Sequence, residues 1–241
     1  MTADQRIPWK RLYVEGAAIV VSILLAFLIE AWWQERLERQ QETEQLSRLH
    51  AEFIVNIERL DGYKDRHLRR QQATEEIFEI IQTAQDNGQS SADLPSLLVR
   101  QMINFPSFEA DTPVLDGLIR SGALEIIESR ELIAYIARWE GGIRDYTELA
   151  LRARRNIDTQ VIPSLSVRGD FGPALMLRFS ARQPESTELD PTHVTKMEID
   201  DEFKMLVANR YENGQAHFFA LRRLTRIAES VIESIEATQS E

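Results

Sequence analysis

A long apolar stretch near the start of the chain constrains its fold more than any other feature. Residues 12–33 read LYVEGAAIVVSILLAFLIEAWW, and 20 of these 22 positions are uncharged, the exceptions being Glu15 and Glu30. As a helix the stretch would measure about 33 Å, because each residue adds about 1.5 Å, and the hydrocarbon core of a bilayer is about 30 Å thick. The sequence therefore predicts a transmembrane helix here.

Two other structures could account for the same stretch. Its strictly uncharged part, residues 16–29, is 14 residues long, a length that also suits a buried core helix or a signal peptide. A core helix usually carries a polar stripe, but Ser22 is the only polar side chain in this part. A signal peptide would end at small residues, whereas this run leads into Glu30 and two tryptophans. An uncleaved anchor is favoured.

Aromatic side chains mark both ends of the predicted span. Trp9 and Tyr13 lie at one end, and Trp32 and Trp33 at the other, where amphipathic rings prefer the headgroup region. Lys and Arg residues are denser before the span than after it, which favours a cytoplasmic N-terminus. We therefore expect a cytoplasmic tail at residues 1–11 and an extracytoplasmic location for the chain that follows the span.

One face of the predicted span carries small and polar side chains at four-residue steps, namely Ala18, Ser22, Ala26 and Glu30. Such a strip lets two helix backbones approach closely, and polar side chains on it can hydrogen-bond across the contact. We interpret it as an oligomerisation face that makes the protein a homo-oligomer. The alternative is that Glu30 is simply hydrated at the membrane interface, where acidic side chains are tolerated.

The chain after the span is predicted to be helical. No Gly or Pro occurs between the span and Gly62, so the transmembrane helix is expected to continue into a long stalk helix, residues 34–92, with an interruption near Gly62. The stalk is expected to contribute to self-association. Coiled-coil heptads are not sustained, however, because no large apolar residue lies between Leu37 and Leu46.

Residues 93–241 are predicted to form an antiparallel helical bundle, which makes the fold all-α. Capping and breaking residues indicate the ends of its helices. Helix starts are predicted at Asp93 with Pro95, Thr112 with Pro113, Ser129 and Asp200, and helix ends at Gly122 and Pro163. Gly141 with Gly142, and Asn213 with Gly214, predict bends within two of the helices. The segment 164–195 contains three Pro and two Gly and is predicted to be irregular.

Two parts of the sequence carry a resemblance. At the start, WKRLYVEG, SILLAFLIEAWW and QERLERQ combine an aromatic and basic lead-in, a short apolar span and a Trp followed by charge. Further on, a Ser-Gly helix stop is followed by an apolar step and another helix, at Leu118, Ser121, Gly122, Leu124, Ile127, Leu132 and Ile136. This arrangement resembles a family of uncharacterised bacterial single-span membrane proteins. The resemblance implies a bacterial inner (plasma) membrane anchor with a periplasmic helical domain, and it says nothing about activity.

No pattern for catalysis, metal binding or cofactor binding is found. The chain has no cysteine, and its four histidines, at positions 50, 67, 193 and 217, lack metal-ligand spacing. A net charge of -11 disfavours nucleic-acid binding. The acids at 200–202 are interpreted as favourable charges in the first turn of a helix, and the arginine clusters, which include Arg66, Arg69 and Arg70, as solvated helix faces.

These features favour a structural or interaction protein, scaffold-like and without enzymatic activity or cofactor. Its expected partners are the lipid bilayer, further copies of itself and another membrane or envelope protein. The alternative is a sensory or small-ligand-binding module that takes a ligand around Trp139 and Tyr146 and relays to a membrane partner. An envelope hydrolase has no candidate residues.

Overall fold

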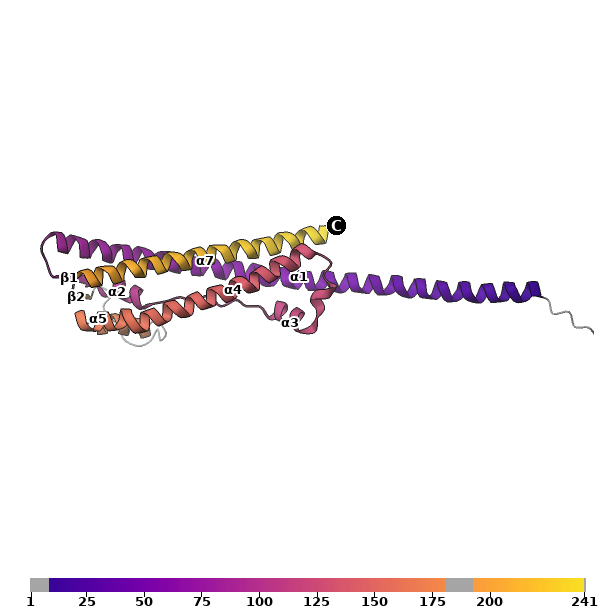
Figure 1. Ribbon diagram of the computed structural model, residues 1–241, viewed down its shortest axis with the longest axis horizontal. Coiled ribbons are helices and arrows are strands. Elements are labelled where there is room, and N and C mark those ends of the chain that lie inside the picture. Colours follow the sequence, from indigo (N-terminus) through magenta and orange to yellow (C-terminus); the bar gives the residue numbers. More distant parts are fainter. Residues whose placement is uncertain (1–8, 181–192, 241) are drawn as a thin grey trace, which may run out of the picture.

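The structure, a computed structural model, describes the backbone of residues 9–180 and 193–240 and the side chains of residues 20–176 and 193–240. It is mostly helical, with one very long helix at the start of the chain (Figure 1), which confirms the predicted all-α class. The long helices are α1 (Trp9–Asp86), α4 (Arg130–Asn156) and α7 (Asp201–Ser240). The short ones are α2 (Ser96–Ile103), α3 (Pro113–Ser121), the 3₁₀ turn η1 (Ala123–Ile126), the π turn η2 (Ile157–Val161), α5 (Ile162–Arg168) and α6 (Gly172–Ser180).

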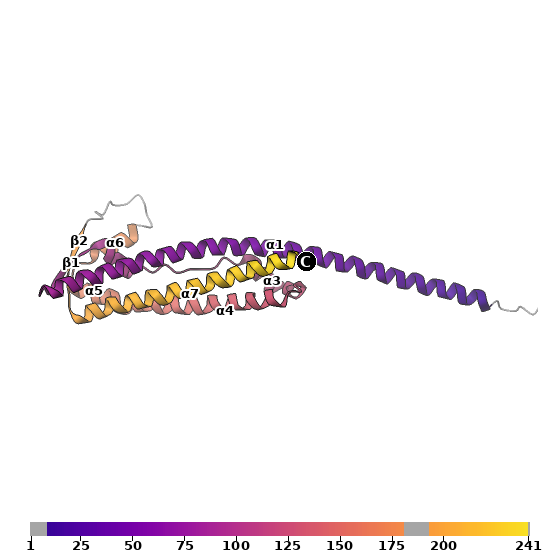
Figure 2. The same cartoon turned by 90° about the horizontal axis from the view of Figure 1, so that it is seen from above.

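Helix α1 is 78 residues long and runs through Gly62 without the predicted interruption. Its first half projects far beyond the rest of the molecule (Figures 1 and 2), and the described side chains are exposed from Val20 to Gln41. From Leu46 onward it supplies one wall of the bundle. The part predicted to be a free stalk, residues 34–92, therefore shares its core with the part predicted to be the bundle.

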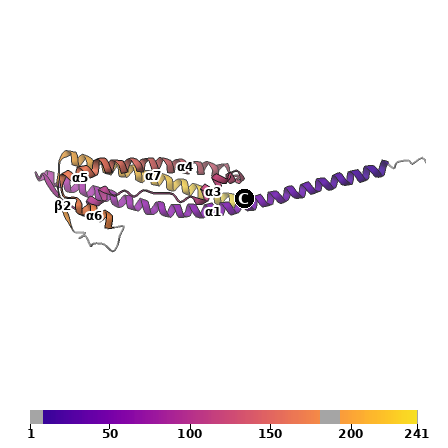
Figure 3. The same ribbon diagram turned by 90° about the horizontal axis from the view of Figure 1, so that it is seen from below.

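The bundle consists of the second half of α1 packed against α7, with α4 on the other side of α7 (Figure 3). Helices α1 and α7 are antiparallel: His50 contacts Glu236 at one end (3.2 Å), and Lys204 Nζ donates to Gln85 Oε1 at the other (3.3 Å). Two buried apolar clusters fill the interior. One lies around Trp139 near the middle of α1, and the other lies around Phe203 at the far end.

A two-stranded antiparallel sheet lies at the far end, formed by β1 (Ser91–Pro95) and β2 (Val194–Glu198). The prediction that Asp93 and Pro95 open a helix is therefore wrong: Asp93 pairs with Lys196, and α2 begins at Ser96. Each strand buries alternate side chains, Leu94 in one and Met197 in the other.

Pro163 does not end the preceding helix, contrary to the prediction. Helix α4 leads through η2 into α5, and Pro163 lies in the first turn of α5, where the N–H that proline lacks is not needed. The segment predicted to be irregular, residues 164–195, contains most of α5, α6 and the start of β2, and its residues 181–192 lie outside the described part of the chain.

Several predicted caps are confirmed. Ser129 Oγ accepts the N–H of Leu132 (3.2 Å), Asp200 Oδ1 accepts the N–H of Phe203 (2.7 Å), and Gly122 ends α3 in the left-handed conformation (φ 75°). Thr112 precedes α3 as predicted, but its side chain does not cap the helix.

Glu52 of α1 supplies that cap instead. Its carboxylate accepts the N–H groups of Val114 (2.5 Å) and Leu115 (3.2 Å), which joins α3 to α1. One turn later Asn56 exchanges two hydrogen bonds with the backbone of Asp111. The loop before α3 is thus held by side chains more than fifty positions away in the sequence.

Candidate functional site

The first candidate site is the projecting part of α1. Ten large apolar side chains between residues 20 and 33 are 50–66% exposed, namely Val20, Val21, Ile23, Leu24, Leu25, Phe27, Leu28, Ile29, Trp32 and Trp33. No other part of the described chain covers them. Burying one such side chain contributes about 1.5–3 kcal/mol, so leaving all ten in water forgoes a large stabilisation. An exposed apolar surface of this extent is typical of an interaction or membrane site.

The predicted residues of this region are placed as follows. Ala26 and Glu30 lie one turn apart on the exposed surface of α1, with Ser22 one turn before them. The rings of Trp32 and Trp33 lie with their centroids 6.5 Å apart, and the guanidinium of Arg36 lies 5.7 Å from the Trp32 ring. The side chains of Trp9, Tyr13 and Ala18 lie outside the described residues.

Across the residues that the structure describes, no helix combines the length and the apolar character needed to cross a membrane. The described side chains of α1 begin at Val20, so residues 12–19 of the predicted span precede them.

The second candidate site is a buried cationic cluster, which the sequence did not predict. It joins α1, α7 and the loop that precedes α3. Its members are His67, Arg70, Phe105, Arg210 and His217. The guanidinium groups of Arg70 and Arg210 lie 5.3 and 5.8 Å from the Phe105 ring. The sequence predicts Arg70 on a solvated helix face, whereas the structure buries it almost completely.

Both buried arginines bond to uncharged groups. Arg210 donates to the carbonyl oxygens of Met102 (2.9 Å) and Asn104 (3.0 Å), at the C-terminal end of α2, where the helix dipole favours a positive charge. Arg70 Nη2 donates to His67 Nδ1, and no described residue accepts from its Nη1. Burial lowers the pKa of Arg70 to about 10 and that of Arg210 to about 9, so both stay charged at neutral pH.

The two histidines of the cluster are neutral. His67 Nε2 donates to the Pro106 carbonyl (3.0 Å), which leaves Nδ1 free to accept from Arg70. His217 lies parallel to His67, with ring centroids 5.8 Å apart. Burial, reinforced by the charge of Arg70, lowers the pKa of His67 to about 2. Burial likewise lowers the pKa of His217 to about 4.

Gly214 lets α7 approach α1 at this cluster. A Cβ atom at this position would lie 3.3 Å from Gln71 Cγ and 3.4 Å from Arg70 Nη2. Neither Gly214 nor the preceding Asn213 interrupts α7. The glycine serves close packing beside a buried charge.

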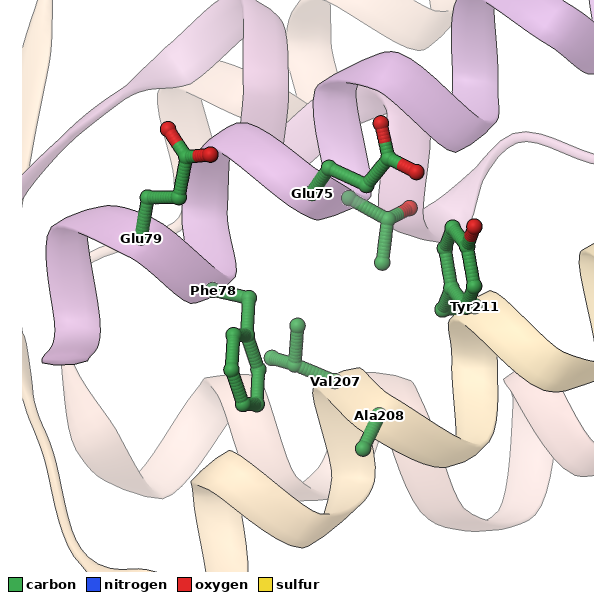
Figure 4. Close-up of a pocket in the computed structure, with 7 residues that line it drawn as sticks. Glu75, Phe78, Glu79, Val207, Ala208 and Tyr211 are labelled. Carbon is green, nitrogen blue, oxygen red and sulfur yellow. The ribbon is translucent and has the colours of Figure 1, made fainter.

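One turn from the cluster, a pocket of about 310 Å³ lies between α1 and α7 (Figure 4). Thr74, Phe78, Val207 and Ala208 form mostly apolar walls, with Tyr211 at one side. Glu75 and Glu79 lie on its α1 edge, and Figure 4 shows their carboxylates directed away from α7. The pocket thus suits an apolar group better than a charged one.

The predicted ligand-binding residues Trp139 and Tyr146 lie inside the core. Trp139 packs edge-on against Phe53 (5.1 Å between ring centroids), and the Tyr146 hydroxyl accepts the N–H of Phe108 (3.2 Å). A surface pocket of about 400 Å³ is lined in part by Trp139 and Thr112. Both aromatic side chains fill the bundle interior, and neither is open to solvent.

No protein-family model, no characterised protein and no solved structure matches the chain. Among the described residues, no group of three or more acidic or histidine side chains is arranged to hold a metal ion.

Proposed function

We propose that the protein is a membrane-anchored structural or interaction protein, in which the projecting part of α1 lies in a lipid bilayer and the bundle lies outside the cytoplasm. The observation that carries the proposal is the set of ten exposed apolar side chains between residues 20 and 33. The bundle closes its own core without them, since its apolar clusters begin at Leu46. A bilayer is the environment in which a helix can expose apolar side chains all round its surface.

The length of the apolar segment agrees with this assignment when the residues before Val20 are counted. Residues 20–33 alone would span about 20 Å, short of a hydrocarbon core of about 30 Å. Residues 12–19, which are also largely apolar, would supply the remaining length. The two tryptophans and Arg36 would then lie in the headgroup region, where aromatic and basic side chains are favoured.

Self-association through the span is the second part of the proposal. Ala26 and Glu30, together with Ser22 one turn earlier, form a narrow strip on a helix surface that the rest of the chain leaves uncovered. Small side chains let a second helix approach closely, and a polar one can hydrogen-bond across the contact. We therefore assign the protein a scaffold role in the bacterial inner membrane, with no catalytic activity.

Membrane fractionation tests the anchor. The full chain should sediment with membranes after carbonate washing, and Val21→Asp with Leu24→Asp should release it, because each charge near the centre of a span costs about 2.5–3.5 kcal/mol. The control is Leu151→Asp with Phe219→Asp, which changes two side chains of similar exposure on the bundle and should leave the chain in the pellet. Wild-type chain in the supernatant would refute the anchor.

A second candidate function, a small-ligand-binding module, is supported by the pocket between α1 and α7. Its apolar walls would take an uncharged apolar molecule. Native mass spectrometry of the purified chain should then show a bound small molecule that Ala208→Trp removes and Ala237→Trp, on an exposed part of the same helix, retains. Equal retention in both variants would exclude this pocket.

A further inference from the structure

A groove lies at the end of the bundle farthest from the projecting part of α1. It runs between the first turns of α7 and the stretch formed by η2 and α5, and it has a volume of about 790 Å³. Figure 1 shows α5 and the start of α7 together at this end. Its lining includes Val167 and Arg168 of α5 and Asp201, Glu202 and Met205 of α7.

Two apolar side chains in this groove stand out by their exposure. Val167 is 75% exposed and Met205 is 70% exposed, which are the highest values for large apolar residues in the described part of the chain. They come from different helices and line the same groove. A single exposed apolar residue needs no explanation, whereas the two most exposed ones on one groove indicate a surface that a partner covers.

The groove is built in advance of any partner. The Arg168 side chain is only 8% exposed and donates to both carboxylate oxygens of Asp200 (2.9 and 3.0 Å) and to Glu202 (3.0 Å). Its guanidinium also lies 5.7 Å from the ring of Phe203, a buried core residue. These contacts fix α5 against the start of α7, so a partner would bind without first ordering the two walls.

The charge of the groove restricts its partner. Arg168 is the only basic side chain among the lining residues, and its charge is already met by Asp200 and Glu202. Asp201 has no described ion pair, so three carboxylates stand against one guanidinium and the rim keeps a net negative charge. A second copy of the chain would bring the same acidic rim into contact with itself, so self-pairing through this groove is disfavoured.

The position of the groove restricts the partner further. Lys204, at the start of α7, bonds to Gln85 of α1, and Gln85 lies 52 residues after Trp33 in one unbroken helix. At about 1.5 Å per residue, the groove lies on the order of 80 Å from the tryptophans. If Trp33 lies at the bilayer surface, as proposed above, the lipids of that membrane cannot reach the groove.

We propose that this groove binds a segment of another protein in which apolar side chains are flanked by Lys or Arg. The apolar side chains would cover Val167 and Met205, and the basic ones would face Asp201 and Glu202. This deepens the scaffold role, and only the choice of protein over lipid rests on the proposed membrane anchor.

The test is photocross-linking in cells that express the full chain at its natural location. A photoreactive phenylalanine analogue replaces Met205 or Val167 in turn, and mass spectrometry identifies the cross-linked peptide. Both positions should give the same peptide, which should carry apolar residues flanked by Lys or Arg. The control position is Phe219, which is 59% exposed on the same helix but does not line the groove, and it should give no such adduct.

Charge reversal completes the test. Asp201→Lys should reduce the adduct at least fivefold, and Glu212→Lys, at an exposed site of α7 outside the groove, should leave it unchanged. The proposal is overturned by the absence of an adduct, by adducts with phospholipid or a second copy, or by an acidic peptide. Fractionation of the same cells distinguishes the failure of this proposal from the failure of the membrane anchor. If the chain is found in the supernatant but still cross-links to a peptide rich in Lys or Arg, the membrane anchor is refuted and the groove proposal stands.

Discussion

The guanidinium of Arg70 donates a hydrogen bond of 2.5 Å to Nδ1 of His67, one turn earlier on α1, inside the bundle core. This bond requires His67 to be neutral, because a protonated ring has no acceptor. Arg70 and Arg210 therefore exclude a third positive charge from the cluster. The stability of the bundle is thereby tied to the protonation of two buried histidines.

We expect the bundle to lose stability as the pH falls below about 6.5. Both histidines have folded pKa values, about 2 and about 4, below the ordinary value of 6.5, so the unfolded chain binds protons that the folded chain excludes. The stability that the two neutral histidines contribute is therefore fully present above pH 6.5. As the pH falls from 6.5 toward the folded pKa of each histidine, that histidine lowers the free energy of unfolding by about 1.4 kcal/mol per pH unit. Urea unfolding at pH 7.5 and pH 5.5 measures the loss.

The pH dependence should be specific to the buried rings. His217→Gln should lower stability at pH 7.5 but reduce the loss between the two pH values, whereas His193→Gln, at an exposed position, should leave that loss unchanged. Equal losses in wild type and His217→Gln would contradict the assignment.

The two buried arginines should differ in their contribution to stability. Arg210→Met leaves the carbonyls of Met102 and Asn104 without their donor, so the free energy of unfolding should fall by about 1–3 kcal/mol. Arg70→Met also removes a hydrogen bond. It eliminates as well a buried N–H group without a partner and the electrostatic repulsion between Arg70 and Arg210, so the free energy of unfolding should fall by less than in Arg210→Met. Chemical unfolding measures both variants, and exposed Arg226→Met should change stability by less than about 0.5 kcal/mol. The reverse order of Arg70 and Arg210 would refute this account.

The adjacent glycines of α4 should respond in opposite directions to alanine. Gly141 has open space where a Cβ would be, so Gly141→Ala should stabilise the protein by about 0.5–1 kcal/mol. At Gly142 the Cβ would lie 2.9 Å from Leu224 Cδ2, and Leu224 is buried, so Gly142→Ala should destabilise it. Thermal unfolding of the two variants compares them within one helix. Equal shifts would show that α4 and α7 are not packed as described.

Glu30 should matter for self-association if the strip on α1 forms the contact. Glu30→Leu keeps the segment apolar but removes its polar group, so chemical cross-linking in membranes should give a weaker oligomer ladder. Glu35→Leu, at an exposed position that forms a salt bridge with Arg39, is the control and should keep the ladder. An unchanged ladder in Glu30→Leu would favour the alternative that Glu30 is hydrated at the interface.

Local signals in the sequence were sufficient for much of the fold. Ser129, Asp200 and Gly122 act through hydrogen bonds or backbone conformation within a few residues, so their positions identify helix ends. Strand β1 was missed because its stability comes from β2, about a hundred residues later. Helix α5 was missed because a π turn upstream places Pro163 where it is tolerated.

The buried cluster could not be recognised because its members come from three segments that lie far apart in the sequence. Phe105 lies in a loop, and Arg70 and Arg210 come from helices that meet only in the folded chain. A surface arginine and a buried arginine look alike in a sequence, because burial depends on which other segments of the folded chain cover the side chain. The sequence does not reveal the groove either. Val167 and Met205 are apolar residues in helices and look like core positions, but the folded chain leaves both exposed.

The unbroken course of α1 has a mechanical consequence. A single helix joins the projecting segment to the far tip of the bundle without a joint, so it acts as a lever arm. With about 80 Å between Trp33 and Gln85, a 10° change in inclination at one end would displace the other by roughly 14 Å. If the projecting part of α1 rotates about the helix axis, the groove lined by Val167 and Met205 rotates about that axis by the same angle.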